Sequence, residues 1–268
     1  MKKIIASLFI TGALFLAFNG TVEARGIRDD GSVLTVGATP VPHAQLLNLI
    51  KDELAAQGFT LKVVEFTDYV QPNSALIAGD LDANFFQHIP YLSSNADWSA
   101  RLVSAFGVHI EPFGLYSTKY KDIAELPNGA SIGIPNDPTN CGRALLLLQS
   151  HGLITLKEGV GLTATPHDVT GNPKNFRFRE LEAAFLPRSL DDIDAATING
   201  NYALQAGFNP VSDSLIIENA ESPYVNIVVV RKGSEQDPKI VALKNAMLSP
   251  IVKEYIENNY NGGVVPVF

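Results

Sequence analysis

Residues 133–143 read Gly-Ile-Pro-Asn-Asp-Pro-Thr-Asn-Cys-Gly-Arg, are followed by Ala-Leu-Leu-Leu-Leu, and predict a strand end, a loop and a helix start. Asp137 is a favourable residue for capping a helix N-terminus, and Pro138 suits the first helical position. Free backbone N–H groups therefore gather near Asn140, where they favour an anion. Arg143 lies about one helical turn further on the same face, and its planar guanidinium can bind a carboxylate through two hydrogen bonds.

This segment alone leaves two interpretations open. In the first, the helix start and Arg143 together bind a carboxylate. In the second, Asp137 and Pro138 only begin a helix, and Arg143 lies in solvent. The rest of the chain has to decide between a binding site and an ordinary surface helix.

The first 24 residues have the pattern of a secretory signal peptide. Lys2 and Lys3 precede an apolar stretch of 15 residues, 4–18, and Val-Glu-Ala at 22–24 offers a cleavage site. The stretch is shorter than the roughly 18 to 20 apolar residues of a membrane-spanning helix. No cysteine lies near the cleavage point. We therefore expect cleavage after Ala24, no lipid anchor, and a soluble periplasmic protein.

The charge and the cysteine content exclude several classes of partner. The 268 residues carry a net charge of −8, which becomes −9 when the leader with its two lysines and one glutamate is removed. An acidic chain without basic runs is a poor ligand for nucleic acid or for an anionic membrane. The single cysteine, Cys141, rules out an internal disulfide in the oxidising compartment to which a secretory signal leads.

Strands and helices alternate along the mature chain. Patterns of apolar residues predict a strand at 33–37, a helix at 44–57 and a second strand at 60–66. A second β-α-β unit begins with a strand at 130–134 and a helix at about 139–150, and later strands are expected at 176–182 and 195–198. This order predicts an α/β protein with parallel sheets and ligands at the carboxyl ends of strands.

Two short motifs repeat 112 residues apart. Asp-Leu-Asp-Ala at 80–83 and Asp-Ile-Asp-Ala at 192–195 each follow an expected helix and lead into a short apolar strand. Each motif could bring its strand to a shared cleft. The remainder of the two halves does not align by eye, so an internal duplication rests on these motifs alone.

Aromatic residues gather near the first expected strand ends. Tyr69, one of Phe85 and Phe86, His88 and Tyr91 could hold a flexible apolar side chain, and sulfur gains additional attraction beside aromatic rings. The alternative is that the rings form core and that His88 is a hydrogen-bonded core histidine. Three amides suit the polar end of an amino acid, although asparagine is equally common in turns: Asn199, Asn201 and Asn226.

Six longer motifs occur in order along nearly the whole mature chain. They are 36–43 (Val-Gly-Ala-Thr-Pro-Val-Pro-His), 66–73 (Phe-Thr-Asp-Tyr-Val-Gln-Pro-Asn), 86–91 (Phe-Gln-His-Ile-Pro-Tyr), 135–140 (Pro-Asn-Asp-Pro-Thr-Asn), 186–192 (Leu-Pro-Arg-Ser-Leu-Asp-Asp) and 222–226 (Ser-Pro-Tyr-Val-Asn). With these motifs the chain resembles the methionine-binding proteins of the NlpA/MetQ type. The resemblance implies a type II periplasmic binding protein, in which two α/β lobes around a central ligand cleft close on a ligand and deliver it to an ABC importer in the inner membrane.

The resemblance also implies the roles of individual residues. It places four residues around the ligand side chain: Tyr69, Phe86, His88 and Tyr91. It assigns the ligand carboxylate to Arg143 and the remaining polar contacts to Asn140, Asn199 and Asn226. We expect residues 25–114 together with 228–268 to form one lobe, and residues 115–227 to form the other.

The chain departs from the family at two places. Most members carry a lipid-attachment cysteine at the cleavage site, where this chain has Phe-Asn-Gly-Thr-Val-Glu-Ala at 18–24. A receptor without an anchor would diffuse away from a cell with one membrane, so we expect a Gram-negative periplasm. Cys141 occupies a place in the 140–143 motif where a thiol is not expected, and it either borders the pocket or points away from it.

We therefore expect a monomeric receptor for L-methionine, D-methionine or a methionine-containing dipeptide, with no catalysis and no cofactor. A metal-ion receptor is the alternative within the binding class, using some of His43, His88, His109, His151 and His167, none of which is paired at close ligand spacing. A secreted serine hydrolase is the alternative from another class, since 129–133 matches G-x-S-x-G. That motif needs a helix directly after Ser131, whereas a strand is expected there.

Overall fold

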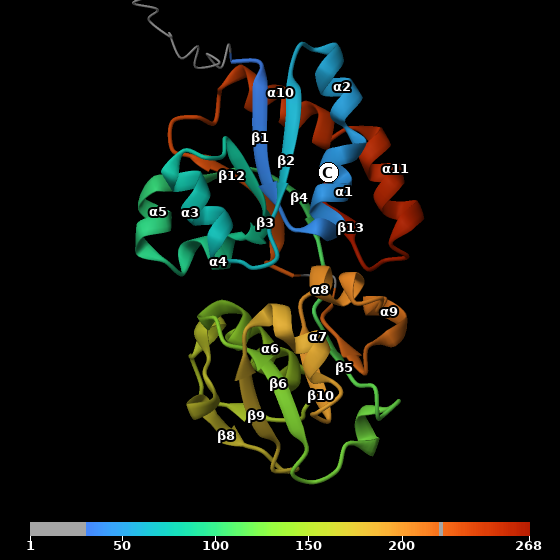
Figure 1. Cartoon of the computed structure of the whole chain (residues 1–268). Coiled ribbons are helices and arrows are strands. Elements are labelled where there is room, and N and C mark those ends of the chain that lie inside the picture. Colours follow the sequence, from blue (N-terminus) through green and yellow to red (C-terminus); the bar gives the residue numbers. More distant parts are fainter. Residues whose placement is uncertain (1–30, 220–221) are drawn as a thin grey trace, which may run out of the picture. The chain divides into compact units, whose positions relative to one another are not determined.

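The computed structural model describes residues 31–219 and 222–268, so the expected signal peptide at 1–24 lies outside the described residues. Within these ranges we find no helix with the length and apolar character that crossing a bilayer requires. The described chain folds around two separate mixed sheets, with order β13-β4-β12-β3-β1-β2 in the first and β11-β5-β10-β6-β9 in the second (Figure 1).

The first sheet is built from six strands: β1 (Val33–Ala38), β2 (Thr60–Glu65), β3 (Ala83–His88), β4 (Leu102–Ile110), β12 (Val225–Arg231) and β13 (Val265–Pro266). β1 runs parallel to β2 and β3, whereas β12 runs antiparallel to β3 and β4. The sheet is therefore mixed where a parallel sheet was expected, because β12 returns from the second sheet instead of following a β-α-β crossover.

Helices cover both faces of the first sheet (Figure 1). One core contains Leu34, Val36 and Leu47 together with residues of the C-terminal helices, and a second core contains Leu76 and Leu92. The helices of this half, including the short π-helix η1, are η1 (Pro40–Ala44), α1 (Gln45–Leu49), α2 (Lys51–Ala56), α3 (Gln71–Ala78), α4 (Ile89–Ser93), α5 (Ala96–Arg101), α10 (Pro238–Met247) and α11 (Pro250–Asn259). The helix expected at 44–57 is divided at Ile50, whose φ of −98° and ψ of 7° leave the helical region.

The second sheet contains β5 (Gly114–Tyr116), β6 (Ser131–Pro135), β9 (Arg177–Leu181), β10 (Ala195–Ile198) and β11 (Ile216–Ile217). α6 (Pro138–Ser150) packs against β6 in one core, and α7 (Leu186–Ser189) and α8 (Gly200–Gln205) share a second core with β10. The remaining elements are α9 (Pro210–Asp213), the hairpin β7 (Thr155–Leu156) and β8 (Val169–Gly171), and four single turns: η2 (Ile123–Glu125), η3 (Gly161–Thr163), η4 (Pro166–Asp168) and η5 (Ala183–Phe185).

The chain passes between the sheets twice. It leaves the first sheet after β4 and enters the second at β5, and it returns between β11 and β12. These crossings fall near the expected lobe boundaries at 114/115 and 227/228. Because β5 begins at Gly114 and β12 at Val225, a few residues at each expected boundary lie in a strand of the other sheet. The boundaries themselves stay a prediction.

Candidate ligand-binding site

A cavity with about 330 Å³ of empty space is lined by residues from both halves of the molecule. Only about 20 Å³ of this space can hold the centre of a water-sized molecule, so the surrounding side chains nearly fill the cavity. All eight residues predicted to bind ligand line it: Tyr69, Phe86, His88, Tyr91, Asn140, Arg143, Asn199 and Asn226. Phe86 is the phenylalanine that faces the cavity, since Phe85 lies fully buried in the core of the first sheet.

Three aromatic rings form one wall of the cavity. Tyr69, Phe86 and Tyr91 have ring centroids 5.8 to 6.0 Å apart. The Tyr91 hydroxyl donates to the Tyr69 carbonyl oxygen at 2.9 Å, and the Tyr69 hydroxyl bonds Asn201 Oδ1 at 2.5 Å. These bonds hold the rings in place, so the wall is a pre-formed apolar surface.

His88 is a neutral hydrogen-bond donor in this cavity. Its Nδ1 accepts the backbone N–H of Tyr91 at 3.1 Å, so the ring proton lies on Nε2, which donates to Asn140 Oδ1 at 3.2 Å. Burial, and then the nearby charge of Arg143, lower the pKa of His88 to about 3. His88 lines the cavity, and it is also buried and hydrogen-bonded through both ring nitrogens, so its contact with a ligand stays a prediction.

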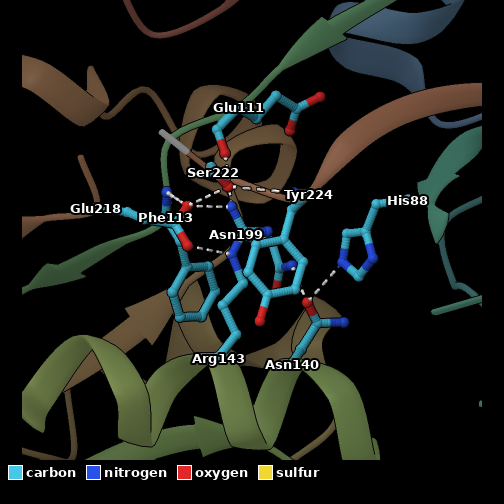
Figure 2. A network of polar contacts seen from close by, with 9 residues as sticks. All are labelled: His88, Glu111, Phe113, Asn140, Arg143, Asn199, Glu218, Ser222 and Tyr224. Atoms are coloured by element: carbon cyan, nitrogen blue, oxygen red, sulfur yellow. Dashed lines mark hydrogen bonds and ion pairs between the residues drawn. The ribbon is translucent and has the colours of Figure 1, made fainter. Parts of the chain in front are cut away.

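The start of α6 is organised as its sequence predicts. Asp137 is the N-cap, its Oδ1 accepts the N–H of Asn140 at 2.9 Å, and Pro138 occupies the first turn. Both Asp137 carboxylate oxygens also accept from Asn140 Nδ2, at 3.1 and 2.9 Å. Asn140 Oδ1 then accepts from Asn199 Nδ2 at 2.9 Å (Figure 2).

Arg143 is buried, with only 4% of its surface exposed. The interpretation that it lies in solvent is therefore wrong. Its Nε donates to Glu218 Oε1 at 3.0 Å and its Nη2 to Glu218 Oε2 at 2.5 Å (Figure 2). Nη2 also donates to the Glu111 carbonyl oxygen at 3.0 Å, and the guanidinium carbon lies 4.1 Å from the Tyr224 ring centroid.

These contacts decide which part of Arg143 is available to a ligand. Glu218 occupies the Nε and Nη2 edge, which is one of the edges through which a guanidinium can bind a carboxylate in two parallel bonds. Among the described residues, Nη1 makes no hydrogen bond. A ligand carboxylate would therefore meet Nη1, because Nε and Nη2 already donate to Glu218 and to the Glu111 carbonyl oxygen.

A buried cluster of ionisable side chains lies beside the cavity. Glu111 Oε1 lies 2.8 Å from His109 Nε2 and 3.4 Å from His43 Nε2, and one potential ligand atom from each residue falls within 4.8 Å of the others. His43 Nε2 also contacts Asn226 Oδ1 at 3.1 Å. Burial lowers the pKa of His43 to about 4 and of His109 to about 3, and raises that of Glu111. Two neutral imidazoles and a carboxylate are a donor set that could hold a divalent metal.

The other histidines do not join this cluster. His151 contacts the Ile217 carbonyl oxygen near the end of α6, and His167 lies in η4. Sequence analysis did not predict that His43, His109 and Glu111 lie close together, because His43 and His109 are far apart in the sequence. The spacing of His109 and Glu111, two residues apart at a strand end, was the available signal, since such residues share one face.

Ser131 lies outside the arrangement that a serine nucleophile needs. It begins β6, which continues to Pro135, so the predicted strand after it is confirmed. Its hydroxyl donates to Asp194 Oδ2 at 2.9 Å, and its backbone N–H donates to the same oxygen at 2.7 Å. Cys141 packs into the core of the second sheet and does not line the cavity, and burial raises the pKa of its thiol to about 12.

Several residues at the site were not identified from sequence. Glu111, Gln87 and Gly200 line the cavity, and Glu218 pairs with Arg143 from 75 residues away. Asn201, which sequence analysis noted among three amides, also lines it. Glu218 follows β11, which pairs with β5, and its carboxylate accepts from Arg143 of α6.

Known proteins resemble this chain over most of its length. The family described as NlpA lipoprotein matches residues 34–268. The methionine-binding lipoprotein MetQ of Bacillus subtilis is 41% identical over 279 residues, covering 100% of this chain and 99% of that protein. The D-methionine-binding lipoprotein MetQ of Escherichia coli is 47% identical over 211 residues, 78% of each chain. A nutrient binding protein from Burkholderia cenocepacia, solved bound to methionine, has a TM-score of 0.84 at 45% identity, covering 88% of this chain and 100% of that one.

Proposed function

Since this chain belongs to the NlpA lipoprotein family, we propose that it is the methionine-binding component of an ABC importer. Its fold is the predicted one, a type II periplasmic binding protein with two α/β lobes around a central ligand cleft. The observation that carries the proposal is a single cavity that combines an aromatic wall with the buried guanidinium of Arg143.

The two ends of the cavity suit the two ends of methionine. The rings of Tyr69, Phe86 and Tyr91 would surround the thioether, since sulfur beside aromatic rings gains about 0.3–1.5 kcal/mol. Arg143 Nη1 would donate to the carboxylate. Because residues from both lobes line the cavity, a ligand that touches both stabilises the closed arrangement, which is the form that a permease of the inner membrane would receive.

A thermal-shift measurement tests this function. L-Methionine should raise the melting temperature, because a ligand that binds only the folded state stabilises it by mass action. D-Methionine and methionine-containing dipeptides, tested beside it, rank the ligands by their shifts.

The buried His43, His109 and Glu111 make a metal receptor the second candidate function. Zinc and manganese therefore belong in the same screen, and we expect neither to raise the melting temperature. If a metal ion raised the melting temperature and methionine did not, the protein would be a metal receptor and not a methionine receptor.

We further propose that the exported protein is monomeric, begins at Arg25 and carries no lipid. The two MetQ relatives named above are lipoproteins, whereas the single cysteine of this chain is Cys141, within α6. The intact mass of protein recovered from the periplasm shows whether the chain begins at Arg25 and whether it carries a lipid. A diacylated product, or one that retains residues 1–24, would contradict this part of the proposal.

A further inference from the structure

Three buried amide side chains, of Asn73, Asn84 and Gln87, form a closed hydrogen-bonded group that we call the amide triangle. Asn73 Nδ2 donates to Gln87 Oε1 at 3.0 Å, and Gln87 Nε2 donates back to Asn73 Oδ1 at 2.7 Å. Asn84 Nδ2 donates to Asn73 Oδ1 at 2.8 Å, and Asn84 Oδ1 accepts from Gln87 Nε2 at 2.9 Å. Removal of any one amide therefore leaves buried polar atoms of the other two without partners.

The amide triangle depends on an irregularity in β3. Asn84 and Gln87 are three residues apart, and in a regular strand such residues point to opposite faces of the sheet. The register between β3 and β12 skips Phe86, which has no partner in β12. One extra residue in a strand is a β-bulge, and it allows Asn84 and Gln87 to meet on one side. The bulged residue, Phe86, is the one that lines the cavity.

The amide triangle also holds the segment that carries a second ring of the aromatic wall. Asn73 lies in the first turn of α3, four residues after Tyr69, and the Pro72 carbonyl oxygen accepts from Asn84 Nδ2 at 3.2 Å. These bonds fasten the start of α3 to β3 (Figure 1). The ring centroids of Tyr69 and Phe86 lie 5.8 Å apart. Asn73 and Asn84 do not line the cavity, so they can act on the wall without touching a ligand.

We propose that the amide triangle holds the bulged Phe86 against Tyr69 and thereby sets the preference of the cavity for a side chain that ends in a thioether. The inference rests on the proposed function and concerns its selectivity. A gap of about 0.5–1 Å forfeits a quarter to a half of the attraction between two atoms, so the rings must stay at contact distance from the sulfur. When the triangle is broken, the methylthio group loses contacts, whereas Arg143 on α6 still meets the carboxylate.

Calorimetric titration of the wild-type protein with L-methionine and L-2-aminobutanoate gives the reference. The second ligand is methionine without its methylthio group, so the ratio of the two affinities measures what the wall contributes. Methionine should bind more tightly. Equal affinities would overturn the inference, because the wall would then contribute nothing to selectivity. Binding of neither ligand would instead overturn the proposed function.

Two substitutions assign the selectivity to the amide triangle. Asn73→Ala should lower the affinity ratio about 2- to 12-fold, the range that sulfur–aromatic attraction covers, and should leave the affinity for 2-aminobutanoate unchanged. Asn84→Ala preserves both hydrogen bonds between Asn73 and Gln87, so it should lower the ratio by a smaller factor. This milder variant also provides the test if Asn73→Ala does not fold.

Asn172→Ala is the matched control. The Asn172 amide also makes two hydrogen bonds, both to the backbone of Phe176, and it lies in the half of the molecule that does not carry the aromatic wall. This variant should lose stability but keep the wild-type affinity ratio. An unchanged ratio in the folded Asn73 and Asn84 variants, whether both affinities fall equally or neither falls, would show that the amide triangle only supports the fold.

Discussion

Arg143 has two partners in different roles, a glutamate of the protein and a proposed ligand. Removing its side chain leaves Glu218 without its cation and removes packing against the Tyr224 ring. The loss of an exposed arginine would hardly affect folding. Arg143 is buried, so its loss should lower the stability of the folded protein.

Arg143→Ala should therefore weaken methionine binding by roughly 10- to 150-fold and also lower the unfolding free energy by about 1–3 kcal/mol. Chemical denaturation and calorimetry measure the two effects. Glu218→Gln is the matched variant, because it removes the ion pair but leaves Nη1 in place, so its binding loss should be smaller. Methioninol, which lacks the carboxylate, should lose little affinity in Arg143→Ala. A normal methionine affinity in Arg143→Ala would remove Arg143 from the binding site.

Three buried histidines make stability depend on pH. The pKa values of His43, His88 and His109 fall from 6.5 to between about 3 and 4, chiefly because burial disfavours the charged ring. The unfolded chain therefore binds protons below about pH 6.5 while the folded protein does not, and stability is lost as the pH falls through that range. The raised pKa of Glu111 acts in the opposite sense, since it favours the folded protein more as the pH falls toward 4.5.

Urea denaturation between pH 7.5 and pH 5 should thus show falling stability, with each histidine contributing at most about 1.4 kcal/mol per pH unit. His88→Gln should reduce this slope because it removes one of the three groups. His167→Gln, at an exposed position, is the control and should leave the slope unchanged. A constant unfolding free energy over this range would contradict the assignment of neutral buried rings.

Six of the eight residues predicted to bind ligand lie in the six motifs that carry the resemblance, and the other two, Arg143 and Asn199, lie outside them. The partners of these residues could not be predicted from the sequence, because each depends on a distant contact. Glu218 reaches Arg143 across 75 residues. Asn199 turns its Nδ2 toward Asn140, and its Oδ1 has no hydrogen-bond partner among the described residues. The charge state of His88 is likewise a property of burial, which a single sequence does not state.

At the scale of elements, the repeated Asp-x-Asp-Ala motifs have equivalent structural roles. The Asp82 carboxylate accepts the N–H of Thr35 in β1 at 2.7 Å, and the Asp194 carboxylate accepts the N–H of Ser131 in β6 at 2.7 Å. The backbone N–H groups of both aspartates donate back to the same two residues. Each motif thus joins the start of one strand to its parallel neighbour in its own sheet.

Asp82→Ala and Asp194→Ala should each lower the unfolding free energy by about 1–3 kcal/mol, because each leaves strand N–H groups without an acceptor. The two losses should add, since the residues belong to different sheets. Asp80→Ala and Asp192→Ala, the exposed first aspartates of the same motifs, are matched controls and should change stability by less than about 0.5 kcal/mol. Equal effects at both aspartates of a motif would contradict this account.

Element types were predictable where the apolar pattern was strong. The strand at 195–198 coincides with β10, and the helix at 139–150 differs from α6 by one residue at its start. The directions of β4, β5 and β12 were not predictable, because the pairing of a strand depends on which sheet the chain enters after a crossing.

At the scale of the whole molecule, several hydrogen bonds join the two halves outside the proposed ligand contacts. The Tyr202 hydroxyl, on α8, donates to the Thr67 carbonyl oxygen at 3.1 Å. Thr67 follows β2 of the first sheet, so this bond connects the lobes. Tyr202 does not line the ligand cavity, which separates its effect from direct contact with a ligand.

Tyr202→Phe should increase the dissociation rate of methionine and lower its affinity by about 2- to 12-fold, the range for a neutral hydrogen bond of about 0.5–1.5 kcal/mol. The physical reason is that the bond is lost only when the lobes separate, so its removal favours separation and ligand release. Stopped-flow measurement of release checks this. Tyr255→Phe, on α11, removes a hydroxyl for which no hydrogen bond is found among the described residues, and it should leave release unchanged. An unaltered dissociation rate in Tyr202→Phe would mean that this contact does not oppose opening, and that closure depends on the ligand and on the residues of the cavity.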